Sequence, residues 1–121
     1  MAKFRFQDLE IWQMSIELGD RLYDIADALE QKHLYRFADQ LRGAGMSISN
    51  NIAEGSACAS DKEFARFLDI ARRSTFENAN IVIVLFRRKL ISETDQNGLL
   101  SAFDLLSRKI TSFRYSLDPK H

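Results

Sequence analysis

Residues 43–57 read GAGMSISNNIAEGSA and hold the side chains most suited to chemistry, namely three serines and two adjacent asparagines among three glycines. A phosphate-binding loop needs a lysine and a serine or threonine directly after its last glycine, following a buried strand. Gly55 is instead followed by Ser-Ala-Cys. A nucleophile elbow needs Gly-x-Ser-x-Gly, and Gly45-Met46-Ser47 lacks the second glycine. We therefore expect no catalytic residue here.

Metal and thiol chemistry have equally little support in the sequence. His33 and His121 stand alone and lack the spacing of metal ligands. Cys58 is the single cysteine, which excludes an internal disulfide and suits a reducing compartment. No histidine lies near it in the sequence to activate the thiol. We expect no metal, no cofactor and no enzymatic activity.

The glycine-rich stretch is better explained as part of a helix. From Leu34 to Gly55, apolar and small residues recur at steps of three and four without a break, which is the period of an α helix. Each interior glycine costs roughly 1 kcal/mol relative to alanine. Close packing of a neighbouring helix must offset that cost, so small residues are expected on the inward side.

Asn51 falls in the apolar row of this helix. A buried amide left unpaired costs about 1–3 kcal/mol, so it needs partners. The following helix carries Ser74, Glu77 and Asn78 on or near its own core row. We expect a polar layer shared by the two helices, which would specify register and oligomer choice. A binding site involving Asn51 and Glu54 is the alternative.

The same periodicity runs through the rest of the chain, and short polar segments interrupt it. Asp8 is a plausible N-cap, Ser60 and Glu63 form a capping box, and Ser92 begins a similar cap. Short connections force antiparallel neighbours. We predict an all-α fold, an up-down-up-down antiparallel four-helix bundle that forms a single domain over residues 1–121. The expected helices span about 8–31, 34–56, 61–89 and 93–117.

Composition limits the possible partners and compartments. The 121 residues are 45% hydrophobic and 28% charged, which is typical of one globular domain. The formal net charge is zero, so no overall basic field favours nucleic acid. The longest apolar run, residues 81–86, is far shorter than the ~20 residues of a membrane span. Because Asp8 and Glu10 also interrupt any signal-peptide core, we expect a soluble, cytoplasmic protein.

Charge is nevertheless uneven along the chain. Residues 1–31 carry seven acids and three bases, whereas residues 61–91 carry seven bases and four acids. Part of the basic set could contact phosphates. The alternative is a solvated helix face, since cations near a helix C-terminus are favoured by the dipole. The candidate nucleic-acid-binding residues are Arg72, Arg73, Arg87, Arg88 and Lys89.

Apolar residues cover more than one side of two predicted helices. Ile11, Ile25 and Ala28 lie off the main row of the first helix, and residues 81–86 are apolar almost all round. Helices apolar on most faces are usually buried on most faces. We therefore predict a homo-oligomer whose interface uses residues 81–86 and the acidic first helix, with that helix near basic groups of the third. Ring closure would require a heterologous interface.

Several short motifs span nearly the whole chain. They are Phe6-x-Asp8-Leu9-x-x-Trp12-Gln13, Gln40-Leu41-Arg42, Ser47, Asn51-Ile52-Ala53-Glu54-Gly55, Glu63-Phe64, Phe67-Leu68, Ile70-Ala71, Ser74 and Glu77. In these motifs the chain resembles a family of bacterial four-helix-bundle proteins. Some of its members are encoded inside intervening sequences of 23S ribosomal RNA genes and were once called S23 ribosomal proteins.

The resemblance implies a homopentamer with a central channel and no enzymatic activity. A distantly similar protein, the accessory variability determinant of diversity-generating retroelements, binds a reverse transcriptase and nucleic acid. The family motif also implies a polar core. Its residues here are Gln40, Arg42, Ser47, Asn51, Glu54, Gly55, Ser74 and Glu77.

Two departures from the family pattern concern the second helix and the corner that follows it. Ser49 stands where the family often has proline, and the region of Cys58 lacks a basic residue that is often present. The second departure argues against nucleic-acid binding at that corner. Two functions stay open, a non-enzymatic oligomeric scaffold and, alternatively, a nucleic-acid-binding accessory protein. The second would take RNA, DNA or a reverse transcriptase as its partner.

Overall fold

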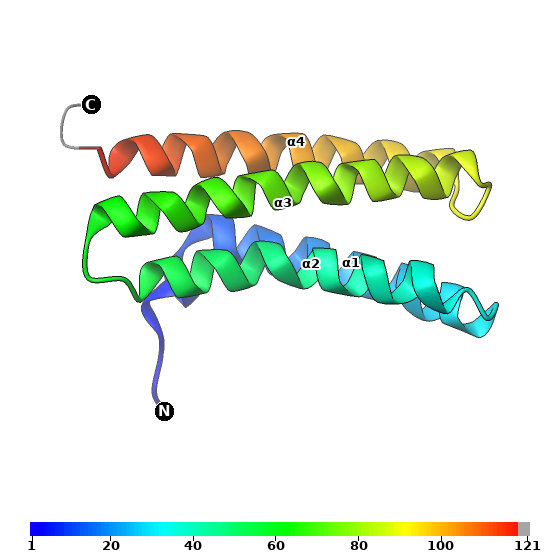
Figure 1. Ribbon diagram of the computed structural model, residues 1–121, viewed down its shortest axis with the longest axis horizontal. Coiled ribbons are helices and arrows are strands. Elements are labelled where there is room, and N and C mark those ends of the chain that lie inside the picture. The colour runs from blue at the N-terminus through cyan, green and yellow to red at the C-terminus, as the bar shows by residue number, and fades with distance from the viewer. Residues whose placement is uncertain (119–121) are drawn as a thin grey trace.

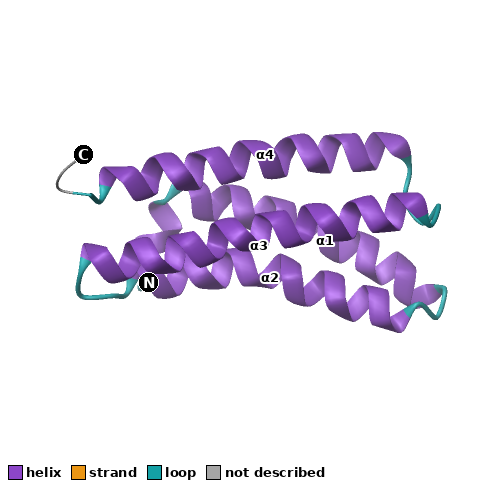
Figure 2. Ribbon diagram, turned by 45° about the horizontal axis from the view of Figure 1, so that its top comes forward, coloured by secondary structure: helices purple, strands orange, loops and turns teal. Residues whose placement is uncertain are grey.

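The computed structural model describes residues 1–118, so His121 lies outside the described part of the chain. A short 3-10 helix and four long α helices make up the fold, and residues 1–118 contain no strand. Successive helices run in alternating directions and are joined by short turns (Figures 1 and 2). The expected all-helical, four-helix fold is confirmed. The elements are η1 (Arg5–Asp8), α1 (Glu10–Gln31), α2 (Tyr35–Ser56), α3 (Asp61–Arg87) and α4 (Glu93–Ser116).

The helix starts follow the sequence signals at two of three predicted caps. The hydroxyl oxygen of Ser60 accepts a hydrogen bond from the Glu63 amide at 3.2 Å, and that of Ser92 accepts one from the Asp95 amide at 3.0 Å. The prediction that Asp8 caps α1 is wrong. Asp8 ends η1, and its carboxylate pairs with Lys3 at 2.7 Å. Leu9 precedes α1 without a side-chain cap.

Two of the helix ends depend on residues in the left-handed backbone region. His33 has φ 63° and Lys89 has φ 61°, which ends a right-handed helix. The amide of Leu90 then donates to the Leu85 carbonyl at 2.9 Å, and the amide of Leu34 donates to the Leu29 carbonyl at 3.0 Å. α3 therefore ends at Arg87, before the expected residue 89, because Lys89 already forms the turn.

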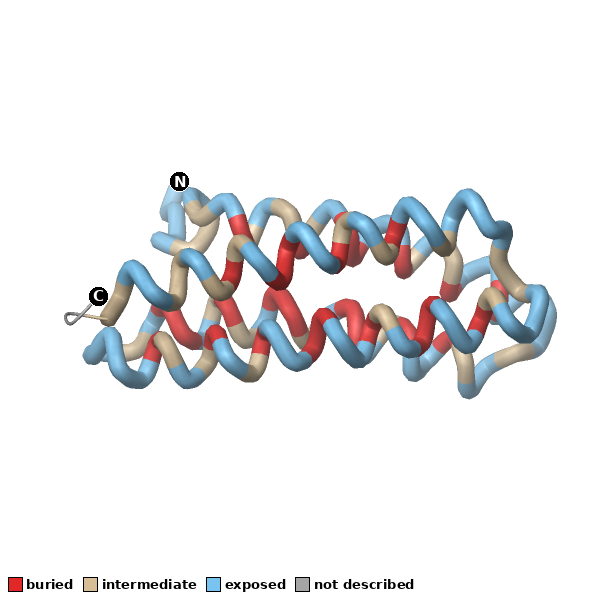
Figure 3. The backbone as a smooth tube through the Cα atoms, turned by 90° about the horizontal axis from the view of Figure 1, so that it is seen from above, coloured by how far each residue is buried: buried red, intermediate tan, exposed pale blue. Residues whose placement is uncertain are grey.

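The core lies along the inward sides of all four helices, where the buried residues gather (Figure 3). Leu22, Leu41, Leu68 and Leu106 are fully buried, one from each helix. Burying such a side chain is worth roughly 1.5–3 kcal/mol. Ile11 is also buried, with 3% exposure. The prediction that Ile11 lies off the main apolar row of α1 is wrong. The row of buried residues starts at Ile11 and not at Trp12.

The arrangement of the helices is not symmetric. α2 packs closely against α1 and α3, and α3 packs closely against α2 and α4. α1 packs against α4 more sparsely, and α1 and α3 are not packed side by side. α1 and α3 therefore occupy opposite corners of the bundle. None of the helices among residues 1–118 is both long and apolar enough to cross a bilayer.

Candidate functional site

Residues 43–55 are helical throughout, as predicted, and they build a polar layer between α2 and α3. The hydroxyl groups of Ser47 and Ser74 lie 2.8 Å apart across the two helices. The side-chain NH₂ of Asn51 donates to the Ser47 carbonyl at 2.8 Å and to its hydroxyl at 3.2 Å. Asn51 is half-buried, and its amide thus bonds within its own helix rather than directly to α3.

Asn78 is the buried amide that joins the two helices directly. It is fully buried. Its NH₂ group donates to the Ala44 carbonyl of α2 at 2.8 Å and to the Ser74 carbonyl of α3 at 2.7 Å. Its Oδ1 has no hydrogen-bond partner among residues 1–118. Sequence analysis predicted Asn78 only as a possible partner of Asn51. Its position in the core row of α3 was the signal that it is buried.

The other motif residues are divided between the packed interior and the surface. Gln40, Glu54 and Glu77 are exposed, so they do not belong to the polar layer. Gly55 is buried. A Cβ atom there would lie 2.8 Å from atoms of both Phe64 and Phe67. The glycine therefore allows the end of α2 to approach the start of α3 closely.

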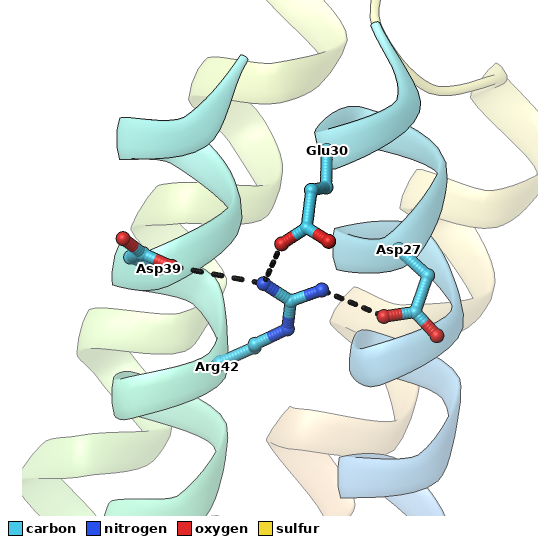
Figure 4. Close-up of polar contacts among 4 residues, drawn as sticks. All are labelled: Asp27, Glu30, Asp39 and Arg42. Atoms are coloured by element: carbon cyan, nitrogen blue, oxygen red, sulfur yellow. Dashed lines mark hydrogen bonds and ion pairs between the residues drawn. The ribbon is translucent and has the colours of Figure 1, made fainter. Parts of the chain in front are cut away.

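Arg42 joins α1 to α2 near the turn between them (Figure 4). Its guanidinium lies 2.7 Å from Asp27, 2.8 Å from Glu30 and 3.6 Å from Asp39. Hydrogen bonds to Asp27 and Glu30 raise the pKa of Arg42 above its ordinary value. The three carboxylates are largely exposed. Arg42 therefore links α1 to α2, and its guanidinium is already paired with carboxylates of the same chain.

The five basic candidates are all exposed on α3 and the turn that follows it. None of them forms an ion pair with a carboxylate in residues 1–118. The guanidinium of Arg72 lies over the Phe76 ring, 5.1 Å from its centroid. Arg73 and Arg87 are separated by about 21 Å along the helix axis at 1.5 Å per residue. The five bases therefore form two groups rather than one patch.

The outer face of α3 also exposes large apolar side chains. Phe76 is 58% exposed, Ile83 39% and Val84 36%. Ile81, Val82 and Leu85 are buried in the core, so only part of the run 81–86 is available to a partner. Sequence analysis missed Phe76. The signal was its spacing of seven residues from Ile83, which places both on one side of a helix.

Residues 1–118 hold no metal cluster, and their single thiol is not activated. No group of three histidine, cysteine, aspartate or glutamate residues among residues 1–118 could hold a metal ion. The Cys58 thiol donates to the Glu54 carbonyl at 3.6 Å. Partial burial raises the pKa of the Cys58 thiol, and Glu63 raises it further. A raised pKa disfavours the thiolate, which is the reactive form of cysteine.

Comparison with known families gives one match. The profile of the family described as "23S rRNA-intervening sequence protein" matches residues 7–112. The matched range contains α1, α2 and α3, most of α4, and every residue of the polar layer. None of the curated proteins compared with the chain matches it.

Proposed function

We propose that this chain, which belongs to the 23S rRNA-intervening sequence protein family, is a non-enzymatic helical scaffold that assembles with copies of itself in the cytoplasm. The observation that carries this proposal is the exposure of Phe76, Ile83 and Val84 together on the outer face of α3. Large apolar side chains grouped on one outward surface are typical of protein interfaces. The number of copies, five, follows only from the family resemblance.

The polar layer supports a scaffold rather than an enzyme. Ser47 and Ser74 bond to each other, and the NH₂ of Asn78 bonds to two backbone carbonyls. These bonds use both N–H groups of the Asn78 side chain and join the two serines to each other. A polar layer inside an apolar bundle instead fixes how helices pair. The arrangement therefore favours a structural role for these motif residues.

Replacing the exposed apolar residues tests the scaffold. The variant carrying Phe76→Ser and Ile83→Ser is expected to dissociate toward monomer, because it removes apolar area from the interface. Light scattering after size exclusion reports the mass. Met46→Ser is the matched control, since Met46 is 46% exposed on α2. An unchanged mass for the double variant, with the control also unchanged, would exclude this face as the interface.

Nucleic-acid binding is the second candidate, and the basic end of α3 favours it. Arg87, Arg88 and Lys89 are adjacent and exposed, and no carboxylate pairs with them in residues 1–118. Consecutive unpaired cations suit phosphate contacts. The partner would be RNA, DNA or the nucleic acid held by a reverse transcriptase.

The second candidate can be tested by the fluorescence anisotropy of a labelled RNA hairpin at two salt concentrations. Binding through phosphates is expected to weaken steeply with salt. The variant Arg88→Glu with Lys89→Glu is expected to weaken binding and to reduce the salt slope by about one per lost contact. Lys62→Glu is the control, because Lys62 is an exposed base at the start of α3, at the opposite end of the bundle (Figure 1). Binding that ignores salt and both variants would contradict this function.

A further inference from the structure

Exposed charges of opposite sign lie on opposite corners of the bundle. On α1, Glu17, Asp20 and Asp24 are exposed and have no ion-pair partner among residues 1–118. On α3, Arg72 and Arg87 are exposed and equally without a carboxylate partner there. α1 and α3 are not packed side by side. These charges therefore cannot neutralise one another within one chain.

Two hollows follow the sparsely packed seam between α1 and α4. One, of about 140 Å³, is lined in part by Met14, Glu17 and Leu105. The other, of about 320 Å³, is lined in part by Asp24 and Ile25. Each hollow thus combines apolar side chains with one of the unpaired carboxylates. We call the two hollows together the α1–α4 socket.

The charge of the socket is set mainly by α1. Glu17, Asp24 and Asp95 line it together with two bases, Arg21 and Lys32. Elsewhere on α1, Asp27 and Glu30 already pair with Arg42, and Glu10 pairs with Lys109. The lining therefore has a small net negative charge, three acids against two bases, with apolar side chains beneath it.

The outer face of α3 has the complementary pattern. Arg72, Phe76, Ile83 and Arg87 are spaced by four, seven and four residues, so they form a single outward row along the helix. We call this row the α3 stripe. Its order is base, apolar, apolar, base. Phe76 and Ile83 are about 10 Å apart along the axis, and Glu17 and Asp24, also seven residues apart, have the same spacing.

We propose that the α1–α4 socket receives the α3 stripe of a second copy of this chain. The inference rests on the self-assembly proposed above and names the surfaces that carry it. Phe76 and Ile83 enter the hollows and leave water. Arg72 and Arg87 each lie about 6 Å farther out along the axis, and their long side chains reach back to the carboxylates of Glu17 and Asp24. Because socket and stripe are different surfaces, the contact is head-to-tail, which generates a ring or a filament rather than a two-fold dimer.

Charge reversal tests whether the two surfaces face each other. One variant carries Arg72→Glu and Arg87→Glu, and another carries Glu17→Lys and Asp24→Lys. All four residues are exposed, so circular dichroism is expected to stay unchanged. In sedimentation velocity each variant is expected to associate at least roughly tenfold more weakly, because like charges then meet. The control variant, Arg36→Glu with Glu54→Lys on α2, is expected to keep the wild-type mass.

The decisive sample carries all four reversals in one chain. Its stripe is acidic and its socket basic, so the pairing is restored and the wild-type mass is expected to return. Double variants that keep the wild-type mass would overturn the socket. A fourfold variant that stays dissociated would also overturn it, since the reversed charges would then not face one another. A wild-type chain that is itself monomeric would instead refute the self-assembly on which the socket rests.

Discussion

Gly43 and Gly55 are both interior glycines of α2, but only one of them is packed against another helix. An added Cβ at Gly43 would meet nothing within 4 Å, whereas at Gly55 it would lie 2.8 Å from Phe64 and Phe67 atoms. Gly43→Ala is therefore expected to raise the free energy of unfolding by up to about 1 kcal/mol. Gly55→Ala is expected to lower it by about 1–3 kcal/mol. Urea unfolding of both variants measures the contrast, and equal effects would contradict it.

Asn78 is the residue whose loss should affect the pairing of α2 and α3 most. Asn78→Ala removes two hydrogen bonds from a fully buried amide, and we expect it to lower the free energy of unfolding by about 1–3 kcal/mol. Asn80→Ala, on the exposed side of the same helix, is expected to stay within about 0.5 kcal/mol of wild type. Thermal and urea unfolding would show whether the two asparagines differ. Indistinguishable stabilities would refute the role given to Asn78.

Sequence analysis predicted the existence of a polar layer better than it predicted its members. Periodicity places residues on helix faces, so the core rows containing Ser74 and Asn78 were visible. Periodicity does not fix the rotation of one helix against the next. Asn51 was expected to reach α3, yet its amide bonds to Ser47 in its own helix. The link across the helices is instead made by Ser47 and Asn78.

At the scale of the elements, predictions succeeded where a local signal was sufficient. Ser60 and Ser92 cap α3 and α4 as expected, because a cap depends on residues three positions apart. The start of α1 and the end of α3 differ from the predicted positions. η1 takes up Asp8, and Lys89 ends α3 in a left-handed conformation without glycine. Such positions depend on how neighbouring segments pack.

The caps give a prediction at this scale. Ser92→Ala removes the hydroxyl that accepts the Asp95 amide, and it is expected to lower the free energy of unfolding by about 1 kcal/mol. Ser101→Ala is the control, because Ser101 is exposed within α4 and alanine is a better helix former there. Urea unfolding followed by circular dichroism would measure both. A neutral Ser92→Ala would mean that α4 does not depend on its cap.

For the whole molecule, the separation of α1 from α3 has the largest consequence. One corner of the bundle is acidic, and the diagonal corner exposes apolar and basic side chains. The sequence revealed both tendencies, because charge and periodicity are local properties. It did not reveal that part of the run 81–86 is used inside the core, nor that Phe76 completes the outward row. Both features depend on how α3 packs against α2 and α4, which periodicity in the sequence does not determine.

Self-assembly is the central claim, and sedimentation equilibrium of the wild-type chain at low micromolar concentration tests it most directly. The chain mass is 14.0 kDa. We predict a species of at least two copies, with a mass that is a whole-number multiple of that value, because the outer face of α3 and the acidic side of α1 would otherwise remain uncovered. A single species at 14.0 kDa over the whole concentration range would contradict the scaffold, the use of both faces and the family-based expectation of a ring.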